Sequence, residues 1–351
     1  MVLHILCVAL QHPKWKDGVM KFLVTGSSGH LGEALMRTLA DQRCEAIGLD
    51  IVPGSFTTHV GSIVDPATVA RCMKGVQVVL HAATLHKPHV ATHSRQAFID
   101  TNITGTLTLL EEAARERVES FVFTSTTSAF GDALVPPPDA PCAWITEEVQ
   151  PVPKNIYGTT KMAAEDLCPL FHRNQRLACI VLRTSRFFPE ADDSPAARAN
   201  YADENLKANE FLFRRVDLAD VVDAHLLAAR KAPLIGFGRY VISATTPFTI
   251  NDLIQLRTDA AGVVRQHAPN YESEYARRGW KMVPGIDRVY VNDRARRELG
   301  WTPRHDFRFV VERLAANEDI RSPLARAVGA KGYHAETFAV GPYPVEEAAG
   351  R

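Results

Sequence analysis

The sequence has few cysteines, no net charge and no long hydrophobic run. Its 6 cysteines among 351 residues show no paired spacing, which argues against a disulfide scaffold and predicts reduced thiols in a cytoplasmic protein. The 40 basic and 40 acidic residues balance. No basic stripe interleaved with aromatic residues stands out, so nothing indicates a nucleic-acid partner.

The first 19 residues form an extension ahead of the fold. The apolar run from Val2 to Leu10 is short, is interrupted by His4 and lacks the basic start of a secretory signal. It is also too short to cross a membrane. Met20 stands directly before the first strand-like segment, so we expect residues 1–19 to contribute little to the fold and expect no membrane anchor.

A glycine-rich turn follows the strand-like run Lys21–Val24. It reads Thr-Gly-Ser-Ser-Gly-His-Leu-Gly over Thr25–Gly32, and leucines then recur at helical spacing. Such a turn directs backbone N–H groups and the positive end of a helix at an anion, and glycine lets a pyrophosphate approach closely. The turn therefore predicts a dinucleotide site made by Gly26, Ser28, Gly29, His30, Leu31 and Gly32.

A tyrosine and a lysine are the second informative pair. Tyr157 and Lys161 are four residues apart, so on a helix they share one face, and the ammonium beside the phenol favours its ionised form. Together with the glycine turn, this pair predicts hydride chemistry.

Short apolar runs alternate with amphipathic helical stretches along the chain. This order predicts an α/β fold, a doubly wound parallel sheet with ligands at the carboxyl ends of its strands. After the extension we expect a dinucleotide-binding domain over 20–183, then a region over 184–321 that completes the sheet and forms a small substrate lobe. A tail rich in Gly, Ala and Pro over 322–351 is expected to be irregular. The strand-like runs are Ala46–Leu49, Val76–Leu80, Phe121–Phe123 and Cys179–Leu182.

These motifs resemble the extended short-chain dehydrogenase/reductase superfamily and, within it, the NAD-dependent epimerase/dehydratase family. The resemblance rests on the glycine turn and the tyrosine-lysine pair, and it extends to Leu299–Pro303, which is similar to the family's Leu-Gly-Trp-x-Pro segment. It implies a Rossmann fold, NAD as cofactor and a carbohydrate-like substrate. We also expect a homodimer.

The resemblance extends the cofactor site to further strand ends. Asp50 ends the second strand, where a carboxylate accepts both ribose hydroxyls and repels a 2′-phosphate, so NAD is favoured over NADP; the alternative is a turn aspartate. Ser62 replaces the family's adenine-binding aspartate, and Asp65 is read as a helix N-cap. The other expected cofactor contacts are Ile63, Ala82, Ala83 and Asn102, the last with helix packing as its alternative.

The resemblance also implies the catalytic residues. Counting back from Gly131 as the family pattern does gives Thr126 as the catalytic hydroxyl, with Ser125 and Thr127 as alternatives if the register slips. Tyr157 then takes the proton of a substrate hydroxyl, and Lys161 also holds the nicotinamide ribose. Sugar dehydratases of this group carry an Asp-Glu pair after the hydroxyl residue, but here Thr127-Ser128 follows, which argues against dehydration by that route.

Substrate contacts are expected from two loops, in addition to Thr127. Thr84 and His86 follow the fourth strand, and Arg183 and Arg186 lie where the family has Leu-Arg-x-x-Asn, in a segment similar to that of uronate dehydrogenases. The two arginines suit a carboxylate or phosphate, with an internal salt bridge as the alternative. His86, His89 and His93 form a cluster, but no cysteine or carboxylate completes a zinc site nearby, so we expect no metal.

Three functions fit these motifs. The favoured one is NAD-dependent epimerisation of a sugar nucleotide. The second is NAD-dependent dehydrogenation of a free sugar or uronate. The third is a non-catalytic NAD-sensing protein, a class that usually lacks the tyrosine or the lysine.

Overall fold

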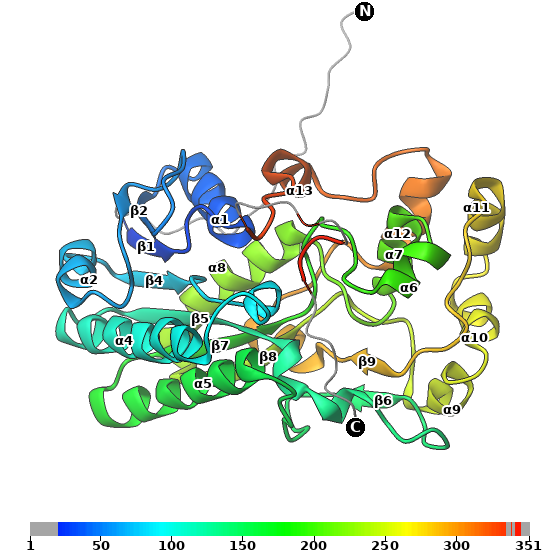
Figure 1. The fold of residues 1–351 in the computed structure, drawn as a ribbon, viewed down its shortest axis with the longest axis horizontal. Coiled ribbons are helices and arrows are strands. Elements are labelled where there is room, and N and C mark those ends of the chain that lie inside the picture. The colour runs from blue at the N-terminus through cyan, green and yellow to red at the C-terminus, as the bar shows by residue number, and fades with distance from the viewer. Residues whose placement is uncertain (1–19, 335–337, 339–340, 345–351) are drawn as a thin grey trace, which may run out of the picture.

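A seven-stranded parallel sheet is the centre of the structure. The computed structural model describes residues 20–334, 338 and 341–344, so the expected extension 1–19 lies outside the described residues (Figure 1). Every strand pair in this sheet is parallel. The strands lie in the order β3 (His59–Val60), β2 (Glu45–Asp50), β1 (Lys21–Thr25), β4 (Val78–His81), β5 (Ser120–Thr126), β7 (Cys179–Thr184) and β8 (Phe237–Ile242).

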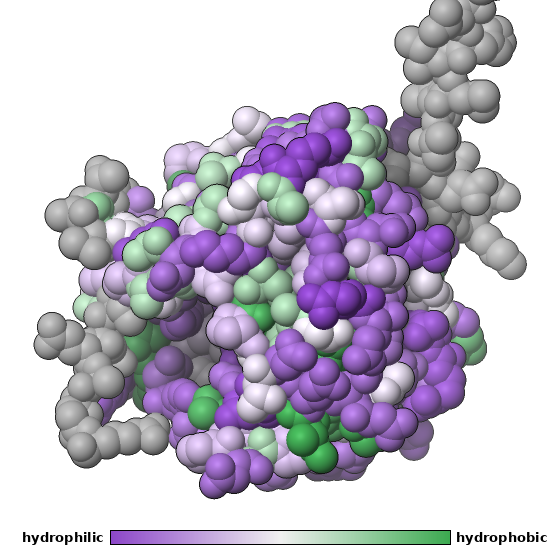
Figure 2. Space-filling view, turned by 90° about the vertical axis from the view of Figure 1, so that its right-hand side faces the viewer, coloured by the Kyte–Doolittle hydropathy of each residue, from purple (hydrophilic) through white to green (hydrophobic). Residues whose placement is uncertain are grey.

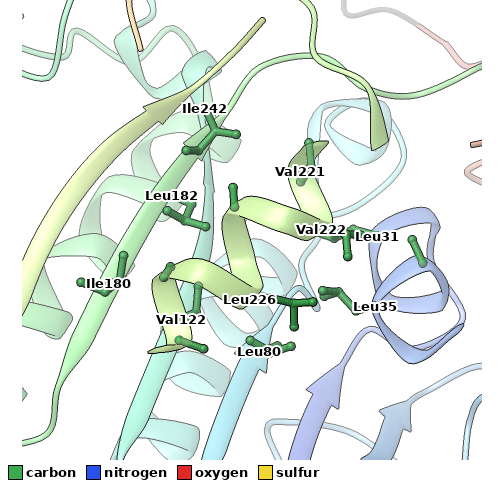
Figure 3. Close-up of a cluster of buried hydrophobic side chains, with 14 of the residues drawn as sticks. Leu31, Leu35, Leu80, Val122, Ile180, Leu182, Val221, Val222, Leu226 and Ile242 are labelled. Carbon is green, nitrogen blue, oxygen red and sulfur yellow. The ribbon is translucent and has the colours of Figure 1, made fainter. Parts of the chain in front are cut away.

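Helices cover both faces of the sheet, as a doubly wound fold requires. On one face α1 (His30–Asp41) and α8 (Leu218–Ile235) pack on side chains such as Leu80 and Leu182 (Figure 3). On the other face α2 (Pro66–Met73), α4 (Gly105–Arg115) and α5 (Ile156–Gln175) pack on Val79 and Phe121. Because alternate residues of a strand point to opposite faces, both clusters draw on the same strands. The predicted fold class is confirmed.

A smaller lobe lies beside the sheet, on the right of Figure 1. Its core includes Phe211, Val263, Tyr275 and Phe307. Polar side chains cover most of its outer face (Figure 2). It contains the paired strands β6 (Ala143–Ile145) and β9 (Arg288–Tyr290), with α6 (Pro195–Asn200), α7 (Asp203–Glu210), α9 (Leu253–Leu256), α10 (Ala260–His267), α11 (Tyr271–Arg278) and α12 (Phe307–Ala315).

Two segments differ from the sequence expectation. The strand expected from Val76 begins at Val78, because Val76 closes a turn by donating its N–H to Met73. The tail expected to be irregular starts with a helix, α13 (Pro323–Val328). Ser322 caps that helix by accepting from Ala325 N–H, and proline in the first turn has the backbone angle that a helix start needs.

The described helices also include the one-turn α3 (Arg95–Phe98). None of the helices in the described part has the length and apolar character needed to cross a bilayer.

The glycine turn between β1 and α1 depends on two close backbone contacts. Gly26 has φ +73°, and a Cβ there would lie 2.8 Å from the Ala83 nitrogen at the end of β4. A Cβ on Gly32 would lie 1.9 Å from the Gly26 carbonyl oxygen. Only glycine permits this packing of helix on turn, which fixes where α1 begins.

We predict that Gly32→Ala destabilises the protein, because its methyl group would overlap the Gly26 carbonyl. Overpacking typically costs about 1–3 kcal/mol, so the melting temperature should fall by at least ~2 °C. Gly29→Ala is the matched control, since its Cβ would lie 3.3 Å from the same oxygen. Equal melting temperatures for the two variants, measured calorimetrically, would contradict the explanation.

Candidate active site

The start of α1 forms an anion-binding end beside a carboxylate. No described side chain caps α1 at Gly29, so the N–H groups of the first turn point out from a positive helix end. Asp50, at the end of β2, accepts the Ser28 and Val52 N–H groups, each at 2.9 Å. This arrangement places pyrophosphate-binding donors next to an acceptor for ribose hydroxyls, as a dinucleotide requires.

The expected adenine side lies where β3 leads into α2. Ser62 accepts the Val64 N–H at 3.1 Å through its hydroxyl. Ile63 is buried against Gly105, where a Cβ would come within 2.6 Å of the isoleucine side chain. Asp65 accepts from Ala67 N–H and Thr68 N–H, which confirms that it caps α2.

Small residues at the end of β4 let the backbone approach the glycine turn. Ala82 N–H donates to the Thr25 carbonyl and Ala83 N–H to the Thr25 hydroxyl, both at 3.2 Å. Thr25 also contacts His81, whose Nδ1 lies 2.7 Å from the threonine Oγ1. The last residues of β1 and β4 are therefore joined along one wall of the site.

Asn102 holds the loop after β4 against the helix of the tyrosine-lysine pair. Its Oδ1 accepts from Thr84 Oγ1 and Leu85 N–H, both at 2.9 Å. Its Nδ2 donates to the Leu85 carbonyl at 2.9 Å and to Thr160 at 3.0 Å. The side chain is buried. These bonds agree with helix packing, which the sequence analysis gave as the alternative to a cofactor contact for Asn102.

Thr126 and Tyr157 come together at the carboxyl end of β5. The Thr126 side chain lies close enough to the Tyr157 phenol to lower its pKa, and Thr126 also accepts the Ser128 N–H at 3.0 Å. The neighbouring hydroxyls have other partners, because Ser125 donates to Glu165 and Thr127 to the Thr184 carbonyl. Of the three hydroxyls considered, Thr126 is thus the one that acts on the tyrosine.

Burial dominates the electrostatics of the tyrosine and the lysine. It raises the pKa of Tyr157 to about 12, against the lowering effect of the Thr126 side chain. Burial lowers the pKa of Lys161 to about 7, although Glu165 opposes the shift. The Lys161 ammonium donates to the Thr124 carbonyl at 2.7 Å and lies 4.0 Å from the Phe123 ring centre. The expected acidification of the phenol is therefore not seen in the protein alone.

His86 lies beside this pair, inside a group of rings. Its ring centre is 6.5 Å from that of Tyr157, 5.6 Å from Phe188 and 4.7 Å from His89. Burial holds the pKa of His86 well below its usual range, so the imidazole is neutral near pH 7. Within the described residues, no group of three or more histidines, cysteines or carboxylates is arranged to hold a metal.

A family comparison agrees with this geometry. The family model described as "NAD dependent epimerase/dehydratase family" matches residues 22–242, which is more than half of the chain. The chain belongs to the NAD-dependent epimerase/dehydratase family. It is accordingly an NAD-dependent enzyme of the short-chain dehydrogenase/reductase type, and the uncapped start of α1 with Asp50 beside it fits this cofactor.

Curated relatives of this NAD-dependent epimerase/dehydratase family protein include sugar-nucleotide epimerases. It is 24% identical to UDP-arabinose 4-epimerase 1 of Arabidopsis thaliana, over 83% of this chain and 77% of that protein. It is 24% identical to UDP-glucose 4-epimerase of Azospirillum brasilense, over 82% and 88% of the two chains.

Solved structures share its fold. A short-chain dehydrogenase/reductase superfamily protein from Agrobacterium tumefaciens with bound NAD aligns at TM-score 0.60 and 22% identity, over 85% of this chain and 97% of that one. UDP-glucose 4-epimerase from Thermotoga maritima with UDP-glucose aligns at TM-score 0.57 and 22% identity, over 85% and 99%.

Arg183 of this family member is part of a buried ion pair. Its Nη2 lies 2.8 Å from Glu165 Oε2, and its Nε lies 3.1 Å from both carboxylate oxygens. The guanidinium also stands 4.9 Å from the Phe130 ring centre. This is the internal salt bridge that the sequence left open as the alternative to a substrate contact, and it ties β7 to α5.

Arg186 faces the lobe and belongs to a larger charge network. It pairs with Asp192, with Asp193 at 3.1 Å and with Glu210 at 3.2 Å. Its side chain remains 25% exposed, whereas that of Arg183 is 3% exposed. The internal salt bridge that the sequence analysis gave as the alternative is thus present for Arg186 as well, and Arg186 is the more exposed of the two arginines.

Sequence reasoning missed three participants in the site. Glu165 holds both Ser125 and Arg183, Phe188 packs on His86, and Glu190 lies 2.7 Å from the His30 imidazole Nε2. Glu165 lies one helical turn after Lys161, and this spacing was the one feature of the sequence that could have indicated its place in the site. Nothing local in the sequence pairs His30 with Glu190, because the contact joins loops after different strands.

We predict that the wild-type enzyme binds NAD more tightly than NADP. We expect Asp50→Asn to lower the ratio of the NADP dissociation constant to the NAD dissociation constant by roughly tenfold. The amide keeps an acceptor for the Ser28 N–H but removes the charge that repels a 2′-phosphate, and one nearby charge is worth about 1–4 kcal/mol. Calorimetric titration measures both affinities. Asp65→Asn, at the cap of α2, is the control and should not change the ratio of the two affinities. Equal affinities of the wild-type enzyme for NAD and NADP would overturn the argument from the Asp50 charge.

Proposed function

We propose that this enzyme epimerises a sugar nucleotide by removing and returning a hydride at one hydroxyl-bearing carbon. The observation that carries the proposal is the neighbouring pair of Thr126 and Tyr157 at the carboxyl end of β5, with Lys161 one turn after Tyr157 on α5. The similarity to proteins named as UDP-sugar 4-epimerases supports the substrate class.

The protein's own groups handle the proton and the orientation of the substrate. NAD, when bound, supplies the acceptor and later the donor of the hydride. In its ionised form, Tyr157 takes the proton of the substrate hydroxyl as that carbon loses hydride, and the phenol returns this proton when hydride comes back on the opposite face. Thr126 hydrogen-bonds the same oxygen, and Lys161, one helical turn after Tyr157, would hold the nicotinamide ribose.

Dehydration is not part of the proposal. The positions after Thr126 hold Thr127, which is buried and bonded to the Thr184 carbonyl, and Ser128, which donates its backbone N–H to Thr126. Neither side chain is an acid or base of the strength that elimination of water requires.

Dehydrogenation of a free sugar or uronate is the second candidate. The partial exposure of the Arg186 side chain favours it, because a guanidinium attracts a carboxylate, although Asp192, Asp193 and Glu210 already pair with this one. A non-catalytic NAD-sensing role is less well supported, since the tyrosine, its hydroxyl partner and the lysine are all in place. A homodimeric state and a cytoplasmic location stay predictions.

We predict that incubation with a panel of UDP-, GDP- and TDP-sugars and free uronates converts one sugar nucleotide to its epimer. Liquid chromatography with mass spectrometry detects the product, and absorbance at the NADH maximum is followed in parallel. An epimerase restores its cofactor in each cycle and accumulates no NADH. Steady NADH formation with a free uronate would instead establish the dehydrogenase.

We further predict that Tyr157→Phe lowers kcat by about 10²–10⁴-fold with NAD affinity nearly unchanged, since only the proton-transferring hydroxyl is lost. The control is Tyr275→Phe in the lobe, which also removes one buried hydroxyl, bonded at 3.0 Å to Asn209, and should leave kcat near wild type. More than about a tenth of wild-type activity in Tyr157→Phe would remove Tyr157 from the mechanism.

A further inference from the structure

After α13 the chain returns to the active site. We call Gly329–His334 the C-terminal strap; its two glycines, Gly329 and Gly332, have φ +64° and +69°. In Figure 1 the red segment after α13 turns past the start of α1 into the region between the sheet and the lobe. The sequence motifs described above give the strap no role. The family match also gives it none, because that match ends at residue 242.

One buried carboxylate fastens the strap. Glu190, in the loop after β7, accepts the backbone N–H groups of Lys331 at 2.9 Å and Gly332 at 3.1 Å, and the Tyr333 hydroxyl at 3.2 Å. It also pairs with His30 of the glycine turn at 2.7 Å. Burial opposes ionisation, but the His30 and Lys331 bonds outweigh it and lower the pKa of Glu190 to about 2. The strap thus supplies most of the donors that compensate this charge.

The strap also bonds to the other two loops of the site. Lys331 pairs with Glu33 on α1 through its ammonium. The Tyr333 carbonyl lies 3.1 Å from His89 Nε2, and His334 Nε2 lies 3.0 Å from the Pro88 carbonyl. The strap therefore spans the loops that follow β1, β4 and β7.

The Tyr333 ring completes the group of rings around His86. Its centre lies 5.1 Å from that of His86, 5.9 Å from Phe188 and 6.1 Å from His30. Within the part of the chain that the structure describes, the strap makes no hydrogen bond or ring contact with Thr126, Tyr157 or Lys161. It also takes none of the N–H groups at the start of α1. The strap therefore contacts the dinucleotide site at His30, through the Lys331 N–H at 3.2 Å and the Tyr333 ring.

A dinucleotide held at the start of α1 and reaching Tyr157 must pass between these three loops, because they edge the carboxyl ends of β1, β4 and β7. We propose that the strap closes over bound NAD, with Tyr333 as a positioning residue that packs on the nicotinamide half and Glu190 as the latch. NAD enters and leaves when the latch opens. The proposal rests on NAD binding alone and not on the identity of the sugar.

The test measures NAD exchange in the full-length chain, independently of turnover. Stopped-flow displacement of bound NAD gives the dissociation rate. Tyr333→Ala removes the ring and should raise that rate by about tenfold. Tyr333→Phe keeps the ring but loses the bond to Glu190, so the rise should be smaller. Trp280→Ala, which removes a half-buried ring that packs on Tyr275 in the lobe, is the control and should leave the rate unchanged.

A second measurement needs no variant. Trypsin can cut after Lys331, which is exposed, and closure over the cofactor should make saturating NAD slow this cleavage in the wild-type enzyme. An unchanged dissociation rate in Tyr333→Ala would overturn the proposal. Two outcomes would show instead that the strap occupies the site and is displaced by the cofactor. One is faster cleavage at Lys331 with NAD, and the other is faster NAD association in Tyr333→Ala without faster dissociation.

Discussion

Parallel pairing of the strands is the constraint on which the rest of the structure depends. Because every strand of the large sheet runs in one direction, Asp50, Thr126 and Arg186 all lie at or just beyond the same edge. The chain leaves β1 for β2 on one side and returns to β4 on the other, so the loops diverge there and open a crevice. The glycine turn lies at that point of divergence, and α1 presents its uncapped end to it.

Buried charge holds this edge rigid. Glu165 lies on the same helix as Tyr157 and Lys161, and its pair with Arg183 fastens that helix to β7. Breaking such a pair by removing one partner typically costs about 3–5 kcal/mol, whereas making it gains little over an apolar contact. The pair is therefore better understood as fixing the position of the tyrosine than as a source of stability. Asn102 does the same from the other side, through Thr160 and the loop after β4.

Exclusion of water sets the charge state of the reacting groups. Burial raises the pKa of Tyr157 to about 12 and lowers that of Lys161 to about 7, so the protein alone keeps the phenol neutral. Proton transfer near pH 7 then needs additional positive charge in the crevice, which oxidised NAD carries. In the proposed mechanism the tyrosine is thus suited to the NAD-bound enzyme, and the proposed closure of the strap would strengthen these interactions by lowering the local dielectric.

Local pattern alone located β1, β2, β4, β5 and β7, the glycine turn, and the positions of Asp50, Asp65 and the Tyr157–Lys161 face, since each follows from short-range periodicity or backbone geometry. Tertiary structure decided the rest. Arg183 and Arg186 look alike in sequence, yet one meets Glu165 in the core and the other lies partly open toward the lobe. Tyr333 reaches His86 only because α13 turns the chain back. Such contacts join residues far apart along the chain, and only the packing of the whole fold selects their partners.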